Sequence, residues 1–316
     1  MKKPVVVIGS YNTDLTIKSR RIPQPGETVI GGQFSEGGGG KGANQAVAAS
    51  RAGADVSFVA RIGNDLLGKA GLQRLREELI DTRFVVQDPQ QPTGVAFIVV
   101  DDAGENSIVV ASGANALLSN HDIAAAQQVI SASQVMLVQL ESPMEAVRAA
   151  IVRAHAAGTM VILNPAPAMS LDISVLKEVD IITPNKVEAE MITGIAVTDE
   201  ESLRAIVQKL LSYGVRHVLI TLGSKGVFTG SKEGMEFLPA FRVSTVDSTG
   251  AGDVFSGALA AFIAAGLPVA QAARKAIAAA SLSVTKLGAQ TSAPTLGEIE
   301  RFIAEQQVPE SNVMSL

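Results

Sequence analysis

Short apolar runs of β-type residues alternate with longer helical stretches along most of this chain. The apolar runs lie at residues 5–9, 56–60, 135–140, 160–164, 180–184 and 217–221. Helical stretches between them include residues 44–52, 66–79, 144–157 and 199–213. Strands that alternate with helices in this way form a parallel sheet with helices on both faces. The pattern therefore predicts a three-layer α/β/α fold.

Two segments interrupt the alternation, and neither contains a helical pattern. Residues 15–34 and 92–111 are typical of extended pairs, with turns at residues 25–26 and 103–104. We expect them to form one small antiparallel sheet, a lid built from two insertions. The α/β domain then comprises residues 1–14, 35–91 and 112–316. A half-solvated sheet with an apolar face needs a cover, which a substrate or a second subunit can supply.

Composition excludes several classes of function. The 316 residues include 26 basic and 31 acidic side chains, for a net charge of −5, with no basic block that would bind nucleic acid. There is no cysteine, which excludes disulfides and thiolate metal sites and suits a reducing compartment. We therefore expect small-molecule partners.

Two further segments of the sequence bear on where the protein is located in the cell. The first residues show no cleavage site of a signal peptide, so we expect a cytoplasmic protein. Residues 254–273 carry no charge, but Gly266 and Pro268 interrupt them after about a dozen helical residues. This stretch predicts a buried core helix, and we expect no membrane partner.

The first candidate binding motif is GGGGKGANQA, from Gly37 to Ala46. It is not a nucleotide P-loop, because Lys41 is followed by Gly and Ala where that motif requires Ser or Thr. Its glycines let the backbone approach a ligand, and Asn44 offers a donor and an acceptor in the first helical turn. These features suit a polyhydroxylated ligand; the alternative is a flexible loop with a helix cap.

The second motif is GSYNTD, from Gly9 to Asp14, at the end of the first predicted strand. Asn12 and Asp14 lie on the same side of an extended chain, so both can face one ligand. An amide and a carboxylate together can bind adjacent sugar hydroxyls. The alternative is an Asx turn that only shapes the backbone.

The third motif is STGAGDVFSGALAAF, from Ser248 to Phe262, in which two glycines and an aspartate precede an apolar helix. The free N–H groups at a helix start bind anions, including a phosphoryl group in transfer. A carboxylate beside an anion site repels the anion, so its presence there suggests a chemical role. Asp253 is therefore a candidate general base; the alternative is an acidic residue that complements the helix dipole.

Several long motifs together resemble the ribokinase family of carbohydrate kinases, of the phosphofructokinase-B type. They comprise residues 37–65, NPAPA at 164–168, DIITPNKVEAEMITG at 180–194, VLITLGSKGV at 218–227 and VDSTGAGDVFSGAL at 246–259. They follow one another in the order of the family, and the resemblance runs from the first strand to about Pro294. It implies the three-layer fold described above.

The resemblance also implies roles for individual residues around the sugar. The sugar would be held by Asn12, Asp14, Gly40, Lys41, Asn44 and Glu141. Asp253 would be the catalytic base, and the amides of Gly250, Ala251 and Gly252 would form the anion hole. Strand alternation in the lid puts Ala96, Ile98 and Val110 on one face, where they would pack over the sugar, with Val99 on the outer face.

The cofactors implied by the resemblance are ATP, Mg²⁺ and a monovalent cation, K⁺ being expected. Asn185 and Glu188 would position the nucleotide phosphates together with Mg²⁺ and water. The nucleotide would be bound by Thr221, Gly223, Ser224, Gly226 and Gly252. The cation would be bound by Asp247, Thr249, Ser283, Lys286, Gly288 and Ser292.

The function implied is ATP-dependent phosphorylation of the primary hydroxyl of D-ribose, giving ribose 5-phosphate, by a homodimer joined through its lids. One alternative is a kinase for another sugar or a nucleoside, such as deoxyribose. A deoxy sugar lacks the 2-hydroxyl and would leave buried polar groups unpaired. The other alternative is a non-catalytic sugar-binding protein on the same fold.

Overall fold

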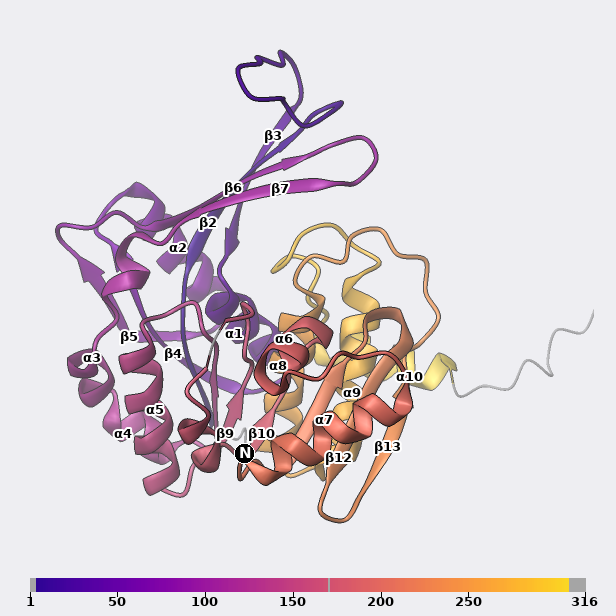
Figure 1. Cartoon of the computed structure of the whole chain (residues 1–316). Coiled ribbons are helices and arrows are strands. Elements are labelled where there is room, and N and C mark those ends of the chain that lie inside the picture. Colours follow the sequence, from indigo (N-terminus) through magenta and orange to yellow (C-terminus); the bar gives the residue numbers. More distant parts are fainter. Residues whose placement is uncertain (1–3, 170, 307–316) are drawn as a thin grey trace, which may run out of the picture.

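The computed structural model describes residues 4–169 and 171–306, and its larger part is built on a nine-stranded sheet (Figure 1). In spatial order the strands are β13 (Gly234–Pro239), β12 (Gly226–Ser231), β11 (His217–Thr221), β10 (Ile181–Ile182), β9 (Met160–Leu163), β8 (Val135–Val138), β1 (Pro4–Ile8), β4 (Asp55–Gly63) and β5 (Asp81–Asp88). Neighbouring strands from β11 to β5 are parallel, and β12 is antiparallel to both of its neighbours. The six predicted strands are confirmed. Three strands were not predicted. Two of them, β5 and β13, lie at the edges of the sheet, where exposed residues interrupt the apolar pattern. The third, β12, is buried, but its glycines and polar residues interrupt the apolar run.

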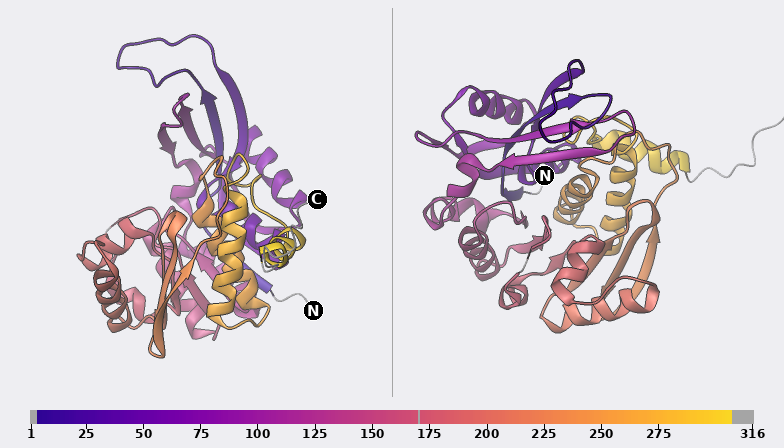
Figure 2. Two further views of the ribbon diagram at one scale, coloured as in Figure 1. Left: turned by 90° about the vertical axis from the view of Figure 1, so that its right-hand side faces the viewer. Right: turned by 45° about the horizontal axis from the view of Figure 1, so that its top comes forward.

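Helices cover both faces of this sheet, which confirms the three-layer fold (Figures 1 and 2). One face is covered by α1 (Lys41–Arg51), α2 (Leu66–Glu77), α8 (Ala251–Ala264), α9 (Val269–Ser283) and α10 (Leu296–Gln306). The other face is covered by α3 (Asn120–Ala125), α4 (Gln127–Ala132), α5 (Met144–Ala156), α6 (Lys186–Thr193) and α7 (Glu200–Ser212). Short 3₁₀ turns are η1 (Gly113–Leu117), η2 (Ile173–Glu178) and η3 (Gly223–Lys225). Strand β1 shows why a continuous apolar run is needed: Val5 and Val7 enter one core, Val6 and Ile8 the other.

The predicted core helix is α8, which is buried from Asp253 to Ala264 between α1 and α9. Gly266 and Pro268 follow it, and α9 begins at Val269. No helix in the described part of the chain combines the length and the apolar character that a membrane span needs.

A second sheet of four strands stands clear of the large domain (Figure 2). Its order is β3 (Gln33–Gly39), β2 (Asn12–Lys18), β6 (Gly94–Val100) and β7 (Asn106–Ala111). The two insertions each form an antiparallel pair, as expected, and the pairs join through parallel pairing of β2 with β6. Strands β2 and β3 extend beyond the first predicted insertion, to residues 12–14 and 35–39. The small sheet therefore joins the large domain just after β1 and just before α1.

Candidate active site

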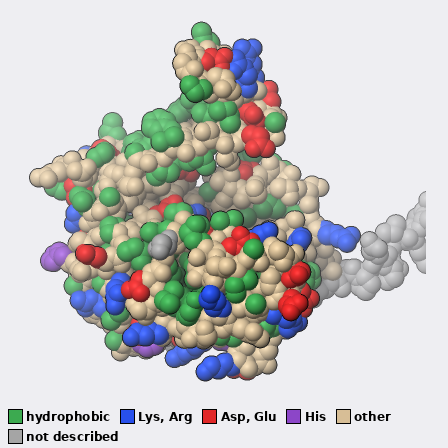
Figure 3. All heavy atoms as spheres, in the orientation of Figure 1, with side chains coloured by type: hydrophobic (Ala, Val, Ile, Leu, Met, Phe, Trp, Pro, Cys, Tyr) green, Lys and Arg blue, Asp and Glu red, His purple; other side chains and the backbone are tan. Residues whose placement is uncertain are grey.

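A cavity of about 190 Å³ lies at the carboxyl ends of the parallel strands, which is the usual ligand site of such sheets. Its lining comprises Lys41, Asn164, Ala166, Thr183, Asn185, Glu188, Thr221, Ser248, Gly250, Ala251, Gly252 and Asp253. The space-filling view shows a hollow between the small sheet and the large domain (Figure 3). The cavity therefore brings together predicted residues from four separate motifs.

The start of α8 forms one wall of the cavity. Gly250 precedes the helix with a φ of 74°, and a Cβ there would lie 2.9 Å from the Cβ of Ala289, so glycine is required. Gly252 differs, because a Cβ on it would meet nothing within 4 Å. Gly250, Ala251 and Gly252 all line the cavity, so the first residues of α8 border space that an anion can occupy.

Asp253 lies on the first turn of α8 and is only 5% exposed. Its Oδ2 accepts a hydrogen bond of 3.0 Å from Nδ2 of Asn44, and its Oδ1 one of 2.9 Å from Nε2 of Gln45. Burial raises the pKa of this carboxyl, although the charge of Lys41 and these two hydrogen bonds act in the opposite direction. A raised pKa makes the carboxylate a better proton acceptor.

Other charged groups gather around Asp253. Burial and the carboxylates of Glu141 and Asp253 raise the pKa of Asp14 to about 6. Burial alone would lower the pKa of the Lys41 ammonium, but Asp253, Glu141 and Glu188 outweigh it and raise that pKa. Lys41, Asp14, Glu141, Glu188 and Asp253 together form what we call the floor of the site. One cation among four carboxylates keeps this floor negative, which suits the hydroxyl donors of a ligand.

Glu141 is anchored by the chain around it. Its Oε2 accepts hydrogen bonds from Oγ of Ser10, at 2.6 Å, and from the backbone N–H of Lys41, at 2.9 Å. Gly40 is the N-cap of α1, with a φ of 85°. These contacts tie the end of β1 and the start of α1 to the loop after β8.

Asn12 and Asp14 both lie on β2, where the small sheet meets the large domain. Oδ1 of Asn12 accepts a hydrogen bond of 2.8 Å from Nδ2 of Asn115, which leaves the amide nitrogen of Asn12 for other partners. A Cβ on Gly39 would lie 2.0 Å from Oδ1 of Asp14, so the glycine run makes room for this carboxylate. The pairing of Asp14 with Ala96, and of Ala96 with Val110, places these three on one face of the small sheet.

Asn185 and Glu188 form a reciprocal capping box at the start of α6. The backbone N–H and Nδ2 of Asn185 each donate to Glu188 at 2.8 Å, and the N–H of Glu188 donates to Oδ1 of Asn185 at 2.9 Å. Burial raises the pKa of Glu188 despite these hydrogen bonds. The pair thus shapes a helix start and also lines the cavity.

The residues expected to bind the nucleotide lie around the end of β11. Thr221 lines the cavity, whereas Gly223, Ser224 and Gly226 lie beyond its lining, in η3 and at the start of β12. A Cβ on Gly226 would lie 2.1 Å from the carbonyl oxygen of Leu238, so this glycine is needed for strand pairing.

The residues expected to bind a cation come from two adjacent loops. Asp247 accepts hydrogen bonds of 2.9 Å from the backbone N–H groups of Thr249 and Gly288. Burial would raise the pKa of Asp247, but these hydrogen bonds outweigh burial and lower it, so the carboxylate is ionised. The side chain of Lys286 pairs with Glu298 at 2.9 Å, which leaves only its backbone for another ligand.

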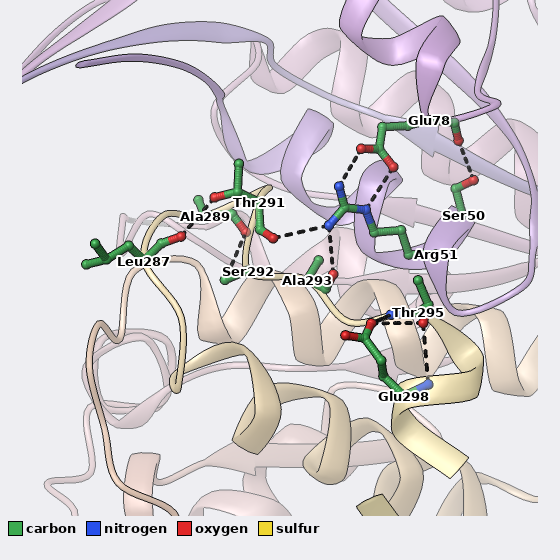
Figure 4. A network of polar contacts seen from close by, with 10 residues as sticks. All are labelled: Ser50, Arg51, Glu78, Leu287, Ala289, Thr291, Ser292, Ala293, Thr295 and Glu298. Carbon is green, nitrogen blue, oxygen red and sulfur yellow. Dashed lines mark hydrogen bonds and ion pairs between the residues drawn. The ribbon is translucent and has the colours of Figure 1, made fainter. Parts of the chain in front are cut away.

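Arg51, at the end of α1, holds the second of these loops (Figure 4). Its Nη1 donates to the carbonyl oxygens of Thr291 (3.3 Å) and Ala293 (2.8 Å), and its guanidinium pairs with Glu78. The hydroxyls of Ser283 and Ser292 donate to carbonyl oxygens within their own turns. Over residues 4–169 and 171–306, no three His, Asp or Glu side chains gather in a way that could hold a metal ion.

Comparison with known proteins decides the family. The profile of the pfkB family carbohydrate kinases matches residues 2–296. The chain belongs to this family. It is 43% identical to a ribokinase of Haemophilus influenzae over 96% of this chain and 99% of the other. It is 36% identical to a deoxyribokinase of Salmonella typhi, over 95% and 98%.

Solved structures agree with the family assignment. A ribokinase of Thermotoga maritima superposes with a TM-score of 0.89 at 34% identity, covering 96% of this chain and 99% of the other. A ribokinase of Arabidopsis thaliana, solved in complex with ribose and ATP, superposes with a TM-score of 0.88 at 30% identity, covering 96% and 99%. This pfkB kinase therefore has the ribokinase-like fold.

Three buried amide side chains near Asp253 were not among the residues predicted from the sequence. Gln45 and Gln139 have no exposed surface and Asn164 is 7% exposed, yet all three belong to one hydrogen-bonded chain that reaches Asp253. For Gln139 and Asn164 a signal was present in the sequence, because each is a polar residue within or directly after an apolar run; Gln45, which follows Asn44, carried no such signal. Such residues are expensive to bury unless they are hydrogen-bonded.

Proposed function

We propose that this pfkB kinase transfers the γ-phosphoryl group of ATP to the primary hydroxyl of D-ribose, giving ribose 5-phosphate and ADP. The observation that carries the proposal is the buried carboxylate of Asp253 at the start of α8, beside amides that border open space. The family, and relatives named ribokinase along nearly the whole chain, support it.

Asp253 acts as the general base in this reaction. Its carboxylate accepts the proton of the primary hydroxyl as that oxygen attacks the γ-phosphorus, and the bond from this phosphorus to the bridging oxygen of ADP breaks. The N–H groups of Gly250, Ala251 and Gly252 stabilise the negative charge on the transferring group. Burial of Asp253 favours proton uptake at the moment of attack.

The sugar lies between β2 and α1. Asn12, Asp14, Lys41, Asn44 and Glu141 bind its hydroxyls, with Gly40 allowing close approach of the backbone. Ala96 and Ile98 of the small sheet cover it and exclude water. The partners are thus a sugar and ATP, with neither nucleic acid nor membrane.

Ribose and 2-deoxyribose are distinguished by the 2-hydroxyl, and a relative named deoxyribokinase supports the second substrate as the alternative. Polar groups built for that hydroxyl would stay unpaired with the deoxy sugar. We expect kcat/KM for ribose to exceed that for 2-deoxyribose about 10-fold or more. A preference for deoxyribose would support the alternative, and turnover of no pentose, hexose or nucleoside would support a binding protein.

The donor atoms present fit the expected cations. The Glu188 carboxylate lines the cavity, and with Asn185, Thr221, Gly223, Ser224 and Gly226 it would hold the nucleotide and Mg²⁺, which neutralises phosphate charge. The ionised Asp247 and oxygens of Thr249, Ser283, Lys286, Gly288 and Ser292 suit K⁺, a hard cation that prefers oxygen ligands.

The potassium site has a direct test. We expect turnover in Mg²⁺ and a bulky organic cation to rise when K⁺ is added. Asp247→Ala should remove this response, because it removes the only carboxylate among these ligands. Wild-type turnover that is indifferent to K⁺ would contradict the site.

We further propose that residues 15–34 and 92–111 form a lid on an α/β domain of residues 1–14, 35–91 and 112–316. The lid joins two chains into a cytoplasmic homodimer. Its outer face, opposite to Asp14, carries Ile17, Phe34, Phe97 and Val109, which are 43, 65, 57 and 68% exposed. Apolar surface of this kind marks an association site.

A further inference from the structure

One of the two side chains that donate hydrogen bonds to Asp253, that of Gln45, lies beyond the reach of the cavity. Gln45 follows Asn44 on α1 but has no exposed surface and does not line the cavity. Its Nε2 donates to Oδ1 of Asp253 at 2.9 Å and to Oδ1 of Asn164 at 3.0 Å. Gln45 therefore holds the carboxylate without being able to touch a substrate.

The backbone fixes which way the Gln45 amide points. Nδ2 of Asn164 donates to the carbonyl oxygen of Thr183 at 2.8 Å, just after β10, so Oδ1 of Asn164 must face Gln45 as an acceptor. Only the nitrogen of Gln45 can satisfy that acceptor. The same nitrogen is then aimed at Asp253.

Gln139 fixes the other end of the same amide. Its Nε2 donates to Oε1 of Gln45. Oε1 of Gln139 is buried without a hydrogen-bond partner in the described chain, and a Cβ on Gly9 would lie 2.1 Å from it. A buried polar atom without a partner needs an explanation. The cost of burying this oxygen is offset by the hydrogen bond from Nε2 of Gln139 to Gln45. Turning the Gln139 amide around would instead place its oxygen against Oε1 of Gln45.

We propose that Gln45 is a positioning residue for phosphoryl transfer: through the chain Gln139–Gln45–Asp253 it holds the base with a free lone pair toward the sugar hydroxyl. This inference rests on the proposed function of Asp253 as the base. Gln139 acts only through Gln45, two hydrogen bonds away from the carboxylate. Asn44 donates to the other carboxylate oxygen of Asp253 but is itself a proposed sugar ligand. Gln45, in contrast, contacts the base and no ligand.

A double-mutant cycle on kcat tests the chain. Methionine matches the length of glutamine and adds no donor. We expect Gln45→Met to lower kcat about 10- to 100-fold and Gln139→Met about 3- to 10-fold, with KM for the sugar within about threefold of wild type. The double variant should fall no further than Gln45→Met. Independent, multiplicative losses would overturn the proposal, as would losses that appear in KM alone.

Thr159→Val is the matched control, because it removes a buried side-chain hydrogen bond of 2.8 Å at the opposite end of β9. It should lower the melting temperature and leave kcat unchanged. If it lowers kcat as much as Gln139→Met does, the losses reflect general destabilisation and the chain has no special role.

A second readout does not depend on turnover. Carbon-13 NMR of labelled aspartate carboxyls follows the charge of Asp253, whose signal is identified by its loss in Asp253→Asn. Each hydrogen bond to this carboxylate lowers its pKa, so Gln45→Met should raise the titration midpoint, Gln139→Met should raise it less, and Thr159→Val should leave it unchanged. The charged groups that face Asp253 stay the same in all variants: Lys41 on α1, Asp14 on β2, Glu141 after β8 and Glu188 on α6.

The two readouts separate two failures. A midpoint unmoved by Gln45→Met would overturn the positioning role whatever the enzyme turns over. A wild type that phosphorylates no sugar would overturn the proposed function, and the titration would still test whether Gln45 holds Asp253.

Discussion

The floor of the site and the small sheet above it are built in opposite ways. On the floor, Asp253 is 5% exposed and is hydrogen-bonded by side chains that are themselves buried. In the small sheet, Ile108 and Val110 on one face and Phe97 and Val109 on the other are at least half exposed. The floor is complete in the single chain, whereas the sheet needs covering from both sides. Reactive geometry is therefore fixed before ligands arrive, and closure depends on what the sheet meets.

The largest loss of activity is expected when Asp253, at the centre of the floor, is replaced. Asp253→Asn keeps the shape of the side chain but cannot accept a proton, so kcat should fall about 10²- to 10⁴-fold. Sugar affinity, measured by calorimetry, should change little. Retention of more than about a tenth of wild-type kcat would mean that Asp253 serves only the start of α8.

The next largest effect concerns the open space beside that carboxylate. Gly252→Ala adds a methyl group where nothing lies within 4 Å, so the fold can accept it, but the methyl occupies the space proposed for the phosphoryl group. We expect kcat/KM for ATP to fall about 10- to 100-fold, while the free energy of unfolding is unchanged or rises by up to about 1 kcal/mol.

Gly297→Ala is the matched control for this substitution. Gly297 is also the second residue of a helix, α10, and a Cβ there also meets nothing within 4 Å. It should gain similar stability and keep full activity. Equal activity in the two variants would show that no transferring group approaches Gly252.

The small sheet can be broken separately on each face. Val109→Asp puts a charge on the outer face and should raise the dimer dissociation constant about 10-fold or more. Ile98 lies beside Thr16 on the face that carries Asp14, so Ile98→Asp should raise the sugar KM about 10-fold while the dimer persists. Light scattering and steady-state kinetics on both variants check this. A wild type that is monomeric at micromolar concentration, or unchanged kinetics in Ile98→Asp, would contradict the two-faced sheet.

The same contrast explains what could be predicted from the sequence. The six strands from β11 to β4 lie inside the large sheet, so their apolar runs were plain, as at Val5 to Ile8. The small sheet was found because its extended segments lack a helical pattern, but the parallel pairing of Asp14 with Ala96 depends on contacts between distant segments. Glycine-rich segments before two helices drew attention to Asp253 and Asn44, and the structure joins the two side chains by a hydrogen bond. The contacts of the chain Gln139–Gln45–Asp253 could not be predicted, since Gln139 and Asn164 are brought to α1 only by the order of strands in the folded sheet.

The smallest expected effect lies at Asp14, where the two regions meet. Its pKa in the folded chain is about 6, against 3.8 as the ordinary value, because the carboxyl is buried near Glu141 and Asp253. A raised folded pKa means that this group favours folding fully below pH 3.8 and loses that contribution as the pH rises through about 6. Asp14→Asn removes the buried charge. At pH 8 it should raise the free energy of unfolding of the ligand-free protein by roughly 1–3 kcal/mol, or a few degrees in melting temperature.

The stabilisation should shrink as the pH falls below about 6, because the wild-type carboxyl then becomes protonated in the folded chain as well. Over the same pH range the wild type should lose affinity for ribose, and Asp14→Asn should have a raised KM at every pH. Thermal melts and sugar titrations at pH 5 and 8 measure both effects. A gain in melting temperature that is equal at the two pH values would mean that the charge of Asp14 costs the fold nothing. A lower melting temperature of Asp14→Asn at pH 8 would mean that the Asp14 carboxylate stabilises the ligand-free fold.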